Sequence, residues 1–152
     1  MKKVLLVLAV ALLSSITMNA QKLDVNEVDQ FTGKVKKLTS FYNLAKTDVG
    51  IIRGSIVRID DSRFLSVTCT ADLGCVGARD NYIMFLYEDG SSVKLNNDFS
   101  DIDCSNEAGS MYSINNLKTE GITHIRLRMS KYYTDGAVYG TYSLTDLVNA
   151  VK

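Results

Sequence analysis

The sequence has few of the groups that enzymes use most often. Its 152 residues include one histidine, three cysteines and neither proline nor tryptophan. It lacks a Gly-x-Ser-x-Gly nucleophile motif, a glycine-rich phosphate loop, a Cys-x-x-Cys pair and a His-Glu-x-x-His zinc motif. Acidic and basic side chains balance at 17 each, whereas nucleic-acid-binding domains usually carry a basic excess. We therefore expect no cofactor, no metal site and no nucleic-acid partner.

Long apolar runs are also missing, apart from one near the start of the chain. Val4 to Leu13 is an unbroken apolar segment that follows two lysines and precedes small and polar residues ending at Ala20. A membrane-spanning helix needs about 20 apolar residues, so this shorter segment predicts no span. Its layout is typical of a secretory signal peptide; the alternatives are an N-terminal anchor or a buried helix. We expect residues 1–20 to be a cleaved signal peptide, residues 21–152 to form one domain, and the protein to be periplasmic or secreted.

The stretch from Tyr82 to Asn97 predicts a β-hairpin at the centre of this domain. Two apolar runs flank Asp89-Gly90, and an Asp-Gly pair in that setting is a strong hairpin signal because turn residues there need positive φ angles. A two-residue turn would pair Leu86 with Val93. The first run is apolar on both sides, so we expect it to be a central strand, with one face formed by Ile83, Phe85 and Tyr87.

Other segments predict further strands and one or two short helices. Ser113 is expected to cap a short helix over 114–120, and Ser143 a C-terminal helix whose apolar stripe packs on the sheet. That stripe is Leu144, Leu147, Val148 and Val151. Strands are expected over 51–60, 63–71, 111–112, 122–130 and 137–142, with a turn at Asp135-Gly136 and a loose, polar lead-in over 21–30. The spacing over 34–42 fits a helix or a strand, and the end of that segment favours a strand.

These elements predict an α+β fold. The connections are too short for parallel crossovers, so we expect an antiparallel sheet of seven to eight short strands with a C-terminal helix packed on one face. The alternative is a small antiparallel β-barrel that closes without a covering helix.

The segment 122–130 places His124, Arg126 and Arg128 on the outward face of a strand, because Ile125, Leu127 and Met129 alternate with them. The basic row could contact a phosphate, a sulfate or an acidic glycan, or it could simply be a solvated strand face. Exposed tyrosines can stack on sugars or on a partner, and tyrosines can also cap the edge of a core. Those near the expected turn are Tyr132, Tyr133, Tyr139 and Tyr142.

The cysteines predict one disulfide in an oxidising compartment. If the segments 63–71 and 82–88 are antiparallel neighbours, the loops that carry Cys75 and Cys104 emerge side by side. We therefore expect Cys75 to pair with Cys104 and the inward-facing Cys69 to remain a buried thiol. The rival pairing joins Cys69 to Cys104.

An acidic stretch is the remaining candidate for chemistry. Asp101-x-Asp103-x-Ser105 begins like a calcium loop, but Asn106 replaces the turn glycine and Tyr112 stands where the bidentate glutamate belongs. The favoured function is therefore a non-catalytic exported domain that binds an unidentified protein or anionic ligand. The alternative is a small periplasmic hydrolase built on carboxylates and assisted by calcium.

Two stretches resemble small exported proteins of Bacteroidetes-type bacteria to which no function is assigned. They are VDQFTG, residues 28–33, and ITHIRLRM, residues 122–129, and the end of the apolar leader at Asn19-Ala20-Gln21 has the same character. The resemblance covers both ends of the mature chain and not its middle. It implies an exported protein of a Gram-negative bacterium, and it carries over no catalytic or binding residue.

Overall fold

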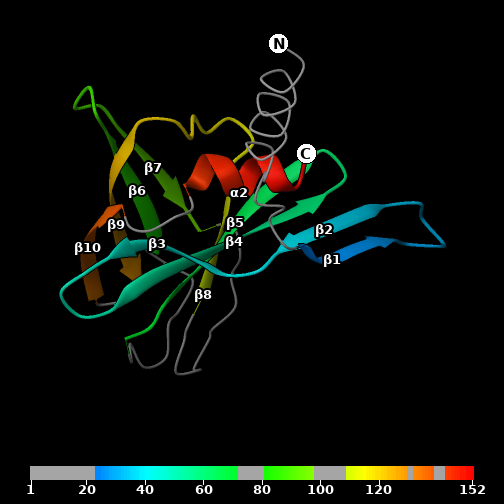
Figure 1. Ribbon diagram of the computed structural model, residues 1–152, viewed down its shortest axis with the longest axis horizontal. Helices are drawn as coiled ribbons and strands as arrows, with labels where there is room; N and C mark the ends of the chain where they lie inside the picture. The colour runs from blue at the N-terminus through cyan, green and yellow to red at the C-terminus, as the bar shows by residue number, and fades with distance from the viewer. Residues whose placement is uncertain (1–22, 72–80, 98–108, 130–131, 139–142) are drawn as a thin grey trace, which may run out of the picture.

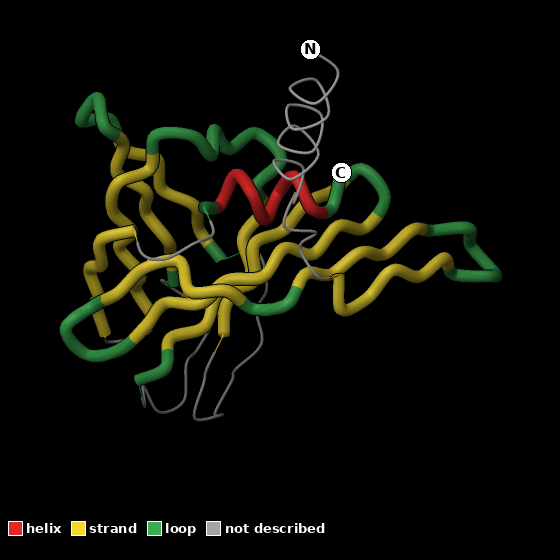
Figure 2. Tube along the Cα trace, in the orientation of Figure 1, coloured by secondary structure: helices red, strands yellow, loops and turns green. Residues whose placement is uncertain are grey.

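The computed structural model describes residues 23–71, 81–97, 109–129, 132–138 and 143–152, which form an antiparallel sheet and a short helix (Figures 1 and 2). The α+β antiparallel class is confirmed, although ten strands form where seven to eight were expected. The strands are β1 (Leu23–Val28), β2 (Val35–Thr39), β3 (Tyr42–Lys46), β4 (Ile51–Ile59), β5 (Ser62–Cys69), β6 (Tyr82–Tyr87), β7 (Ser92–Asn96), β8 (Gly109–Ser113), β9 (Ile122–Met129) and β10 (Tyr132–Val138). The helix is α2 (Leu144–Ala150).

The long strand β4 organises the sheet. One edge of β4 pairs with β5 along nearly its whole length, and β5 pairs in turn with β8. The other edge pairs with β3 over its first half and with β2 over its second half. From β3 the sheet continues through β10, β9 and β6 to β7, while β2 and β1 project to the other side as a hairpin arm (Figure 1). The sheet of the described residues does not close, so the barrel alternative is not adopted.

Helix α2 completes the core. Its apolar stripe lies in one buried cluster with Ile83, Phe85 and Tyr87, as the sequence predicts. Ser143 Oγ accepts a hydrogen bond from Asp146 N, and the Asp146 carboxylate accepts one from Ser143 N, a reciprocal cap worth about 1 kcal/mol. At the other end, Arg58 and Lys37 donate to the carbonyls of residues 151 and 152 at 3.0 and 2.7 Å. These two cations complement the negative end of the helix dipole.

The register of the central hairpin differs from the predicted one by one residue. Tyr87 N donates to Ser91 O, and Gly90 N donates to Tyr87 O, so the loop has three residues and Gly90 takes a φ of 80°. Phe85 therefore pairs with Val93, and Leu86 pairs with Ser92. An Asp-Gly pair is compatible with a two-residue loop and with a three-residue loop. The three-residue loop also needs a residue with positive φ before the second strand, and Gly90 is that residue. The central position of β6 is confirmed, since it pairs with β9 and β7.

Four other expectations about the fold are wrong. The polar lead-in is strand β1, which is mostly exposed because it lies in the arm. The segment 114–120 forms a single turn, closed by a hydrogen bond from Leu117 N to Ile114 O, in place of a helix. Strands β5 and β6 are not neighbours, because β5 pairs with β4 and β8. Asp135 and Gly136 lie inside strand β10 and form no turn.

Gly136 is needed for a close approach of two strands. A β-carbon at this position would lie 2.9 Å from both the Ala45 β-carbon and the Lys46 carbonyl oxygen of β3. Distances this short do not occur between real side chains and their neighbours, so only glycine lets β10 pair with β3 here. This pairing joins the strands around β9 to the strands around β4.

Candidate functional site

The outward face of β6, β9 and β10 collects the side chains that the sequence singles out. His124, Arg126 and Arg128 all point outward from β9 as predicted, the first two exposed and the third half-buried. The pairing of β9 with β6 and β10 places each of them in a cross-strand row. The rows are Leu86–His124–Ala137, Met84–Arg126–Asp135 and Tyr82–Arg128–Tyr133.

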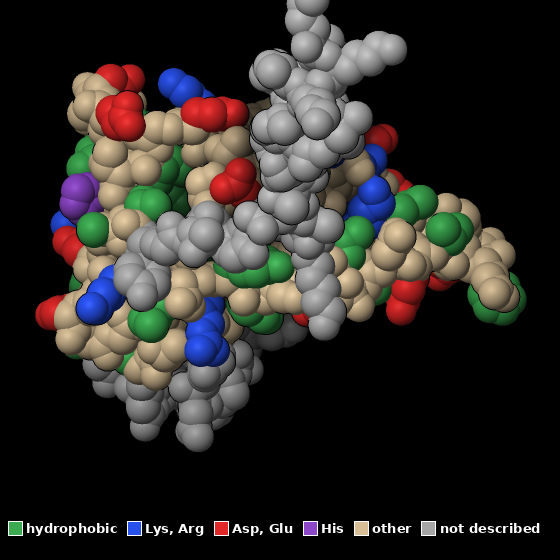
Figure 3. All heavy atoms as spheres, in the orientation of Figure 1, with side chains coloured by type: hydrophobic (Ala, Val, Ile, Leu, Met, Phe, Trp, Pro, Cys, Tyr) green, Lys and Arg blue, Asp and Glu red, His purple; other side chains and the backbone are tan. Residues whose placement is uncertain are grey.

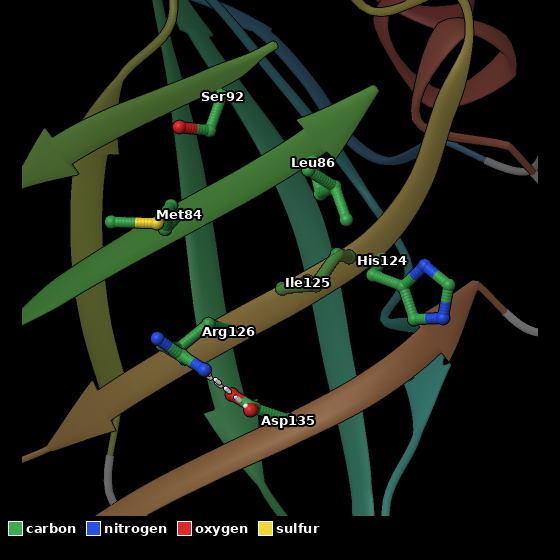
Figure 4. A pocket seen from close by; sticks show the side chains of 7 residues that line it. All are labelled: Met84, Leu86, Ser92, His124, Ile125, Arg126 and Asp135. Carbon is green, nitrogen blue, oxygen red and sulfur yellow. Dashed lines mark hydrogen bonds and ion pairs between the residues drawn. The ribbon is translucent and has the colours of Figure 1, made fainter. Parts of the chain in front are cut away.

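An ion pair occupies the middle row. Arg126 donates from Nε to Asp135 Oδ1 at 2.6 Å and from Nη2 to Asp135 Oδ2 at 2.7 Å (Figure 4). These hydrogen bonds lower the pKa of Asp135 and raise the pKa of Arg126. The sequence alone implies that Arg126 is an unpaired cation in a basic row. The structure shows that its charge is paired with Asp135. The bidentate contact fixes the guanidinium in one orientation and leaves its remaining N–H groups as donors.

Aromatic and cationic side chains form the third row and extend it onto β7. Arg128 Cζ lies 5.1 Å from the centre of the Tyr133 ring, and Lys94 Nζ lies 4.2 Å from the centre of the Tyr82 ring. The two rings meet edge to face, with their centres 6.4 Å apart. Cation–π contacts and edge-to-face packing hold the row in place, yet the Tyr133 side chain is 59% exposed.

Two hollows lie on this face, one on each side of the ion pair. The apolar one holds about 300 Å³ and is shown in Figure 4. It is lined by Met84, Leu86, Ser92, His124, Ile125, Arg126 and Asp135. The polar one holds about 620 Å³ and is more open. It is lined by Lys46, Thr47, Asp48, Arg126, Tyr133 and Asp135.

Several carboxylates of the described residues accept hydrogen bonds from neighbouring groups of the fold, and these bonds do not favour proton transfer. Both oxygens of Asp135 are bonded to Arg126, and Asp48, the other carboxylate of the polar hollow, lies on the exposed turn after β3. Asp89 Oδ1 accepts from Ser91 N and Ser91 Oγ, which lowers the pKa of Asp89. Asp60 Oδ1 accepts from Val35 N at 3.0 Å. Within the described ranges, no three His, Cys, Asp or Glu side chains gather as metal ligands would.

Several predicted features lie outside the described residues. They are the signal segment 1–20, the acidic stretch 98–107, Cys75, Cys104, Tyr139 and Tyr142. Cys69 is described, and it is a buried free thiol as expected. None of the described helices is long and apolar enough to cross a membrane.

Sequence reasoning missed the partners of the basic row. The sequence predicts a turn at Asp135-Gly136 and a pair between Leu86 and Val93, whereas Asp135 pairs with Arg126 and Leu86 with Ser92, so it indicates neither hollow. The alternation within 122–129 gave the direction of each basic side chain, but the strand on either side could be identified only from the pairing. The chain matches no protein-family model, no curated protein and no solved structure, so the site is interpreted from its own geometry.

Proposed function

We propose that this protein is a non-catalytic, exported binding domain whose ligand is an acidic sugar chain held on the outer face of β6, β9 and β10. The observation that carries the proposal is the polar hollow beside the Arg126–Asp135 pair, with the exposed ring of Tyr133 in its wall. An open hollow of this size accommodates a few sugar units and leaves both ends of a chain free.

The chemistry of the hollow matches a sugar ring. The apolar face of the ring stacks on Tyr133, because an aromatic side chain offers a large, rigid surface. The hydroxyl groups of the sugar reach the fixed guanidinium of Arg126 and the carboxylate of Asp135. Such a pair of donor and acceptor, held in place before the ligand arrives, lowers the entropy lost on binding.

Charge selects an acidic sugar over a neutral one. The face carries the cations Lys46, Lys94, Arg126 and Arg128 against the carboxylates of Asp48 and Asp135. The excess of positive charge attracts carboxylate or sulfate groups. Acidic and basic side chains are interspersed over the surface that Figure 3 presents.

The hydrolase alternative has less support. A glycoside hydrolase needs one carboxyl group kept protonated as the general acid and a second kept ionised. Asp135 has the opposite environment for an acid, because Arg126 lowers its pKa. We therefore expect the domain to bind sugar chains without cleaving them.

The test is titration calorimetry with a short galacturonate oligomer, a sulfated oligosaccharide of equal length and a neutral glucose oligomer. We expect the acidic ligands to bind, Tyr133→Ala to weaken them by about tenfold or more, and Phe41→Ala, which removes another exposed aromatic, to leave binding unchanged. Equal binding of the neutral oligomer, or full binding by Tyr133→Ala, would contradict the proposal. Release of shorter sugars would favour the hydrolase.

A further inference from the structure

The tip of the β1–β2 arm presents the most exposed large apolar side chain among the described residues. Phe31 is 99% exposed, and Val28 beside it on the arm is 62% exposed. Isolated apolar side chains are common on protein surfaces, but a phenylalanine with essentially no contact to its own chain is unusual. The arm extends away from the body of the sheet (Figures 1 and 2).

The tip is held in one conformation. Asp29 Oδ1 accepts hydrogen bonds from Phe31 N at 2.9 Å and from Thr32 N at 2.7 Å. Two backbone hydrogen bonds of 2.8 Å close the loop, from Gly33 N to Asp29 O and from Asp29 N to Lys34 O. Gly33 takes the positive φ of 69° that the loop requires. A ring on such a tip loses little conformational freedom when it enters a pocket, which favours binding.

The apolar hollow on the opposite side of the molecule fits this ring. Its volume of about 300 Å³ is sufficient for one phenyl group, and its walls include Met84, Leu86 and Ile125. The thioether of a methionine makes favourable contacts with aromatic rings. Leu86 is 40% exposed at the hollow, so a ring placed there would cover an apolar side chain that is otherwise partly in water.

The tip also carries a hydrogen-bond acceptor, and the hollow carries donors. Asp29, which lies two residues before Phe31, carries a negative charge that its backbone hydrogen bonds stabilise, and these bonds lower its pKa. His124 and Arg126 lie at the rim of the hollow. A tip that enters the hollow therefore brings the Asp29 carboxylate toward the N–H groups of Arg126 that do not bond Asp135.

The arm and the hollow of one molecule cannot meet. The arm leaves the sheet at the β2 end of β4, whereas β6, β9 and β10 lie on the other side of the body (Figure 1). We propose that Phe31 of one copy of this chain inserts into the hollow formed by Met84, Leu86 and Ile125 of a second copy. The proposal does not depend on the sugar ligand, because it uses the apolar hollow and not Tyr133.

Such a contact is heterologous, because two different surfaces meet. The second copy still has a free arm, and the first still has a free hollow, so the contact repeats and produces a row of molecules unless a ring closes. Concentration therefore sets the length of the assembly, and removal of either surface ends growth.

The test is sedimentation velocity of protein purified from its own cells, at concentrations up to about 1 mM. The intact mass of this protein shows at which residue the chain begins. We expect the average mass of the wild type to increase with concentration beyond that of two copies. Phe31→Ala and Leu86→Lys should each remain monomeric. The first lacks the ring at the tip of the arm, and the second places a charged side chain in the wall of the hollow. Tyr133→Ala, an aromatic variant on the same face, should assemble like the wild type.

A mixture of the two monomeric variants gives the decisive result. Phe31→Ala keeps a working hollow and Leu86→Lys keeps a working arm, so an equal mixture should form a species of two copies and nothing larger. Thermal unfolding checks that each variant is folded. A wild type that stays monomeric, a Phe31→Ala variant that still assembles, or a mixture that stays monomeric or grows beyond two copies would overturn the proposal.

Discussion

The hydroxyl of Tyr87 donates a 2.6 Å hydrogen bond to the carbonyl oxygen of Lys118. This contact ties strand β6 to the segment before β9. Tyr112, the other tyrosine of the core, has no such partner among the described residues, although its hydroxyl is buried. Ser110, whose hydroxyl accepts a hydrogen bond from Asn81 Nδ2 at 3.4 Å, lies near the Tyr112 hydroxyl and offsets only part of the effect of burial on its pKa. Burial raises the pKa of Tyr112 to about 12.

The two tyrosines predict substitutions of opposite sign. Tyr87→Phe should lower the free energy of unfolding by about 1 kcal/mol, because it leaves the Lys118 carbonyl without its donor. Tyr112→Phe should raise it by about 1 kcal/mol, because it removes a buried polar group that lacks a partner. Urea denaturation of both variants measures the changes. A Tyr112→Phe variant that is less stable than the wild type would show that the hydroxyl has a partner.

The pKa of Asp135 gives a prediction about pH. Because Arg126 lowers this pKa in the folded state, the stabilisation from the pair is present above the ordinary value of 3.8. It is lost as the pH falls below 3.8 through the lowered pKa. Carbon-13 NMR of the carboxyl groups measures the titration, and Arg126→Gln should return the pKa of Asp135 toward its ordinary value. Titration of wild-type Asp135 at 3.8 or higher would be inconsistent with the pair.

Gly136→Ala should separate β10 from β3. The added β-carbon would meet Ala45 and the Lys46 carbonyl at 2.9 Å, and overpacking of this kind destabilises by about 1–3 kcal/mol. Ala137→Ser, at the exposed neighbouring position, is the control and should change the stability little. The measurements are denaturant unfolding and hydrogen exchange of the β3 amides. Unchanged exchange in β3 would mean that the strands accommodate the extra carbon.

The disulfide between Cys75 and Cys104 remains a prediction, with a different geometric basis. The assumed pairing of β5 with β6 is wrong, yet the stems of both cysteine-bearing segments lie together. Thr68 of β5 pairs with Gly109 of β8, and Asn97 N donates to Asn81 O at 3.0 Å. The bond should contribute about 3 kcal/mol. Peptide mapping without reduction tests it, and an alkylated, unlinked Cys75 peptide would rule it out.

Export is tested by the mass of the native protein. The basic, apolar and small-residue order of residues 1–20 predicts a mature chain that begins at Gln21. An intact mass of protein purified from its own cells should therefore lack the first 20 residues. A mass that retains them would reject the signal peptide and, with it, the oxidising compartment that the disulfide requires.

Local patterns predicted the elements whose burial is regular. Leu127 and Arg126 alternate between core and solvent along β9, and Ser143 and Asp146 form the expected cap of α2, because both signals depend only on nearby residues. Strand β1 was missed because an exposed arm needs no apolar face, so its sequence resembles a loop.

The site could not be predicted because it depends on pairing between strands. A shift of one residue in the loop at Gly90 moves Leu86 from Val93 to Ser92, and this shift decides which side chains surround the apolar hollow. Asp135 meets Arg126 only because Gly136 belongs to a strand and not to a turn. The direction of a side chain is local information, whereas the identity of its neighbour is not.

Helix α2 follows every described strand in the chain, and this order has a consequence for synthesis. The buried cluster that contains Phe85 and Leu127 stays incomplete until residues 144–151 have been made, because Leu144, Leu147, Val148 and Val151 belong to it. A growing chain adds about 5–20 residues per second, so α2 follows the last strand within seconds. The complete buried cluster therefore cannot form in a chain that ends before residue 144.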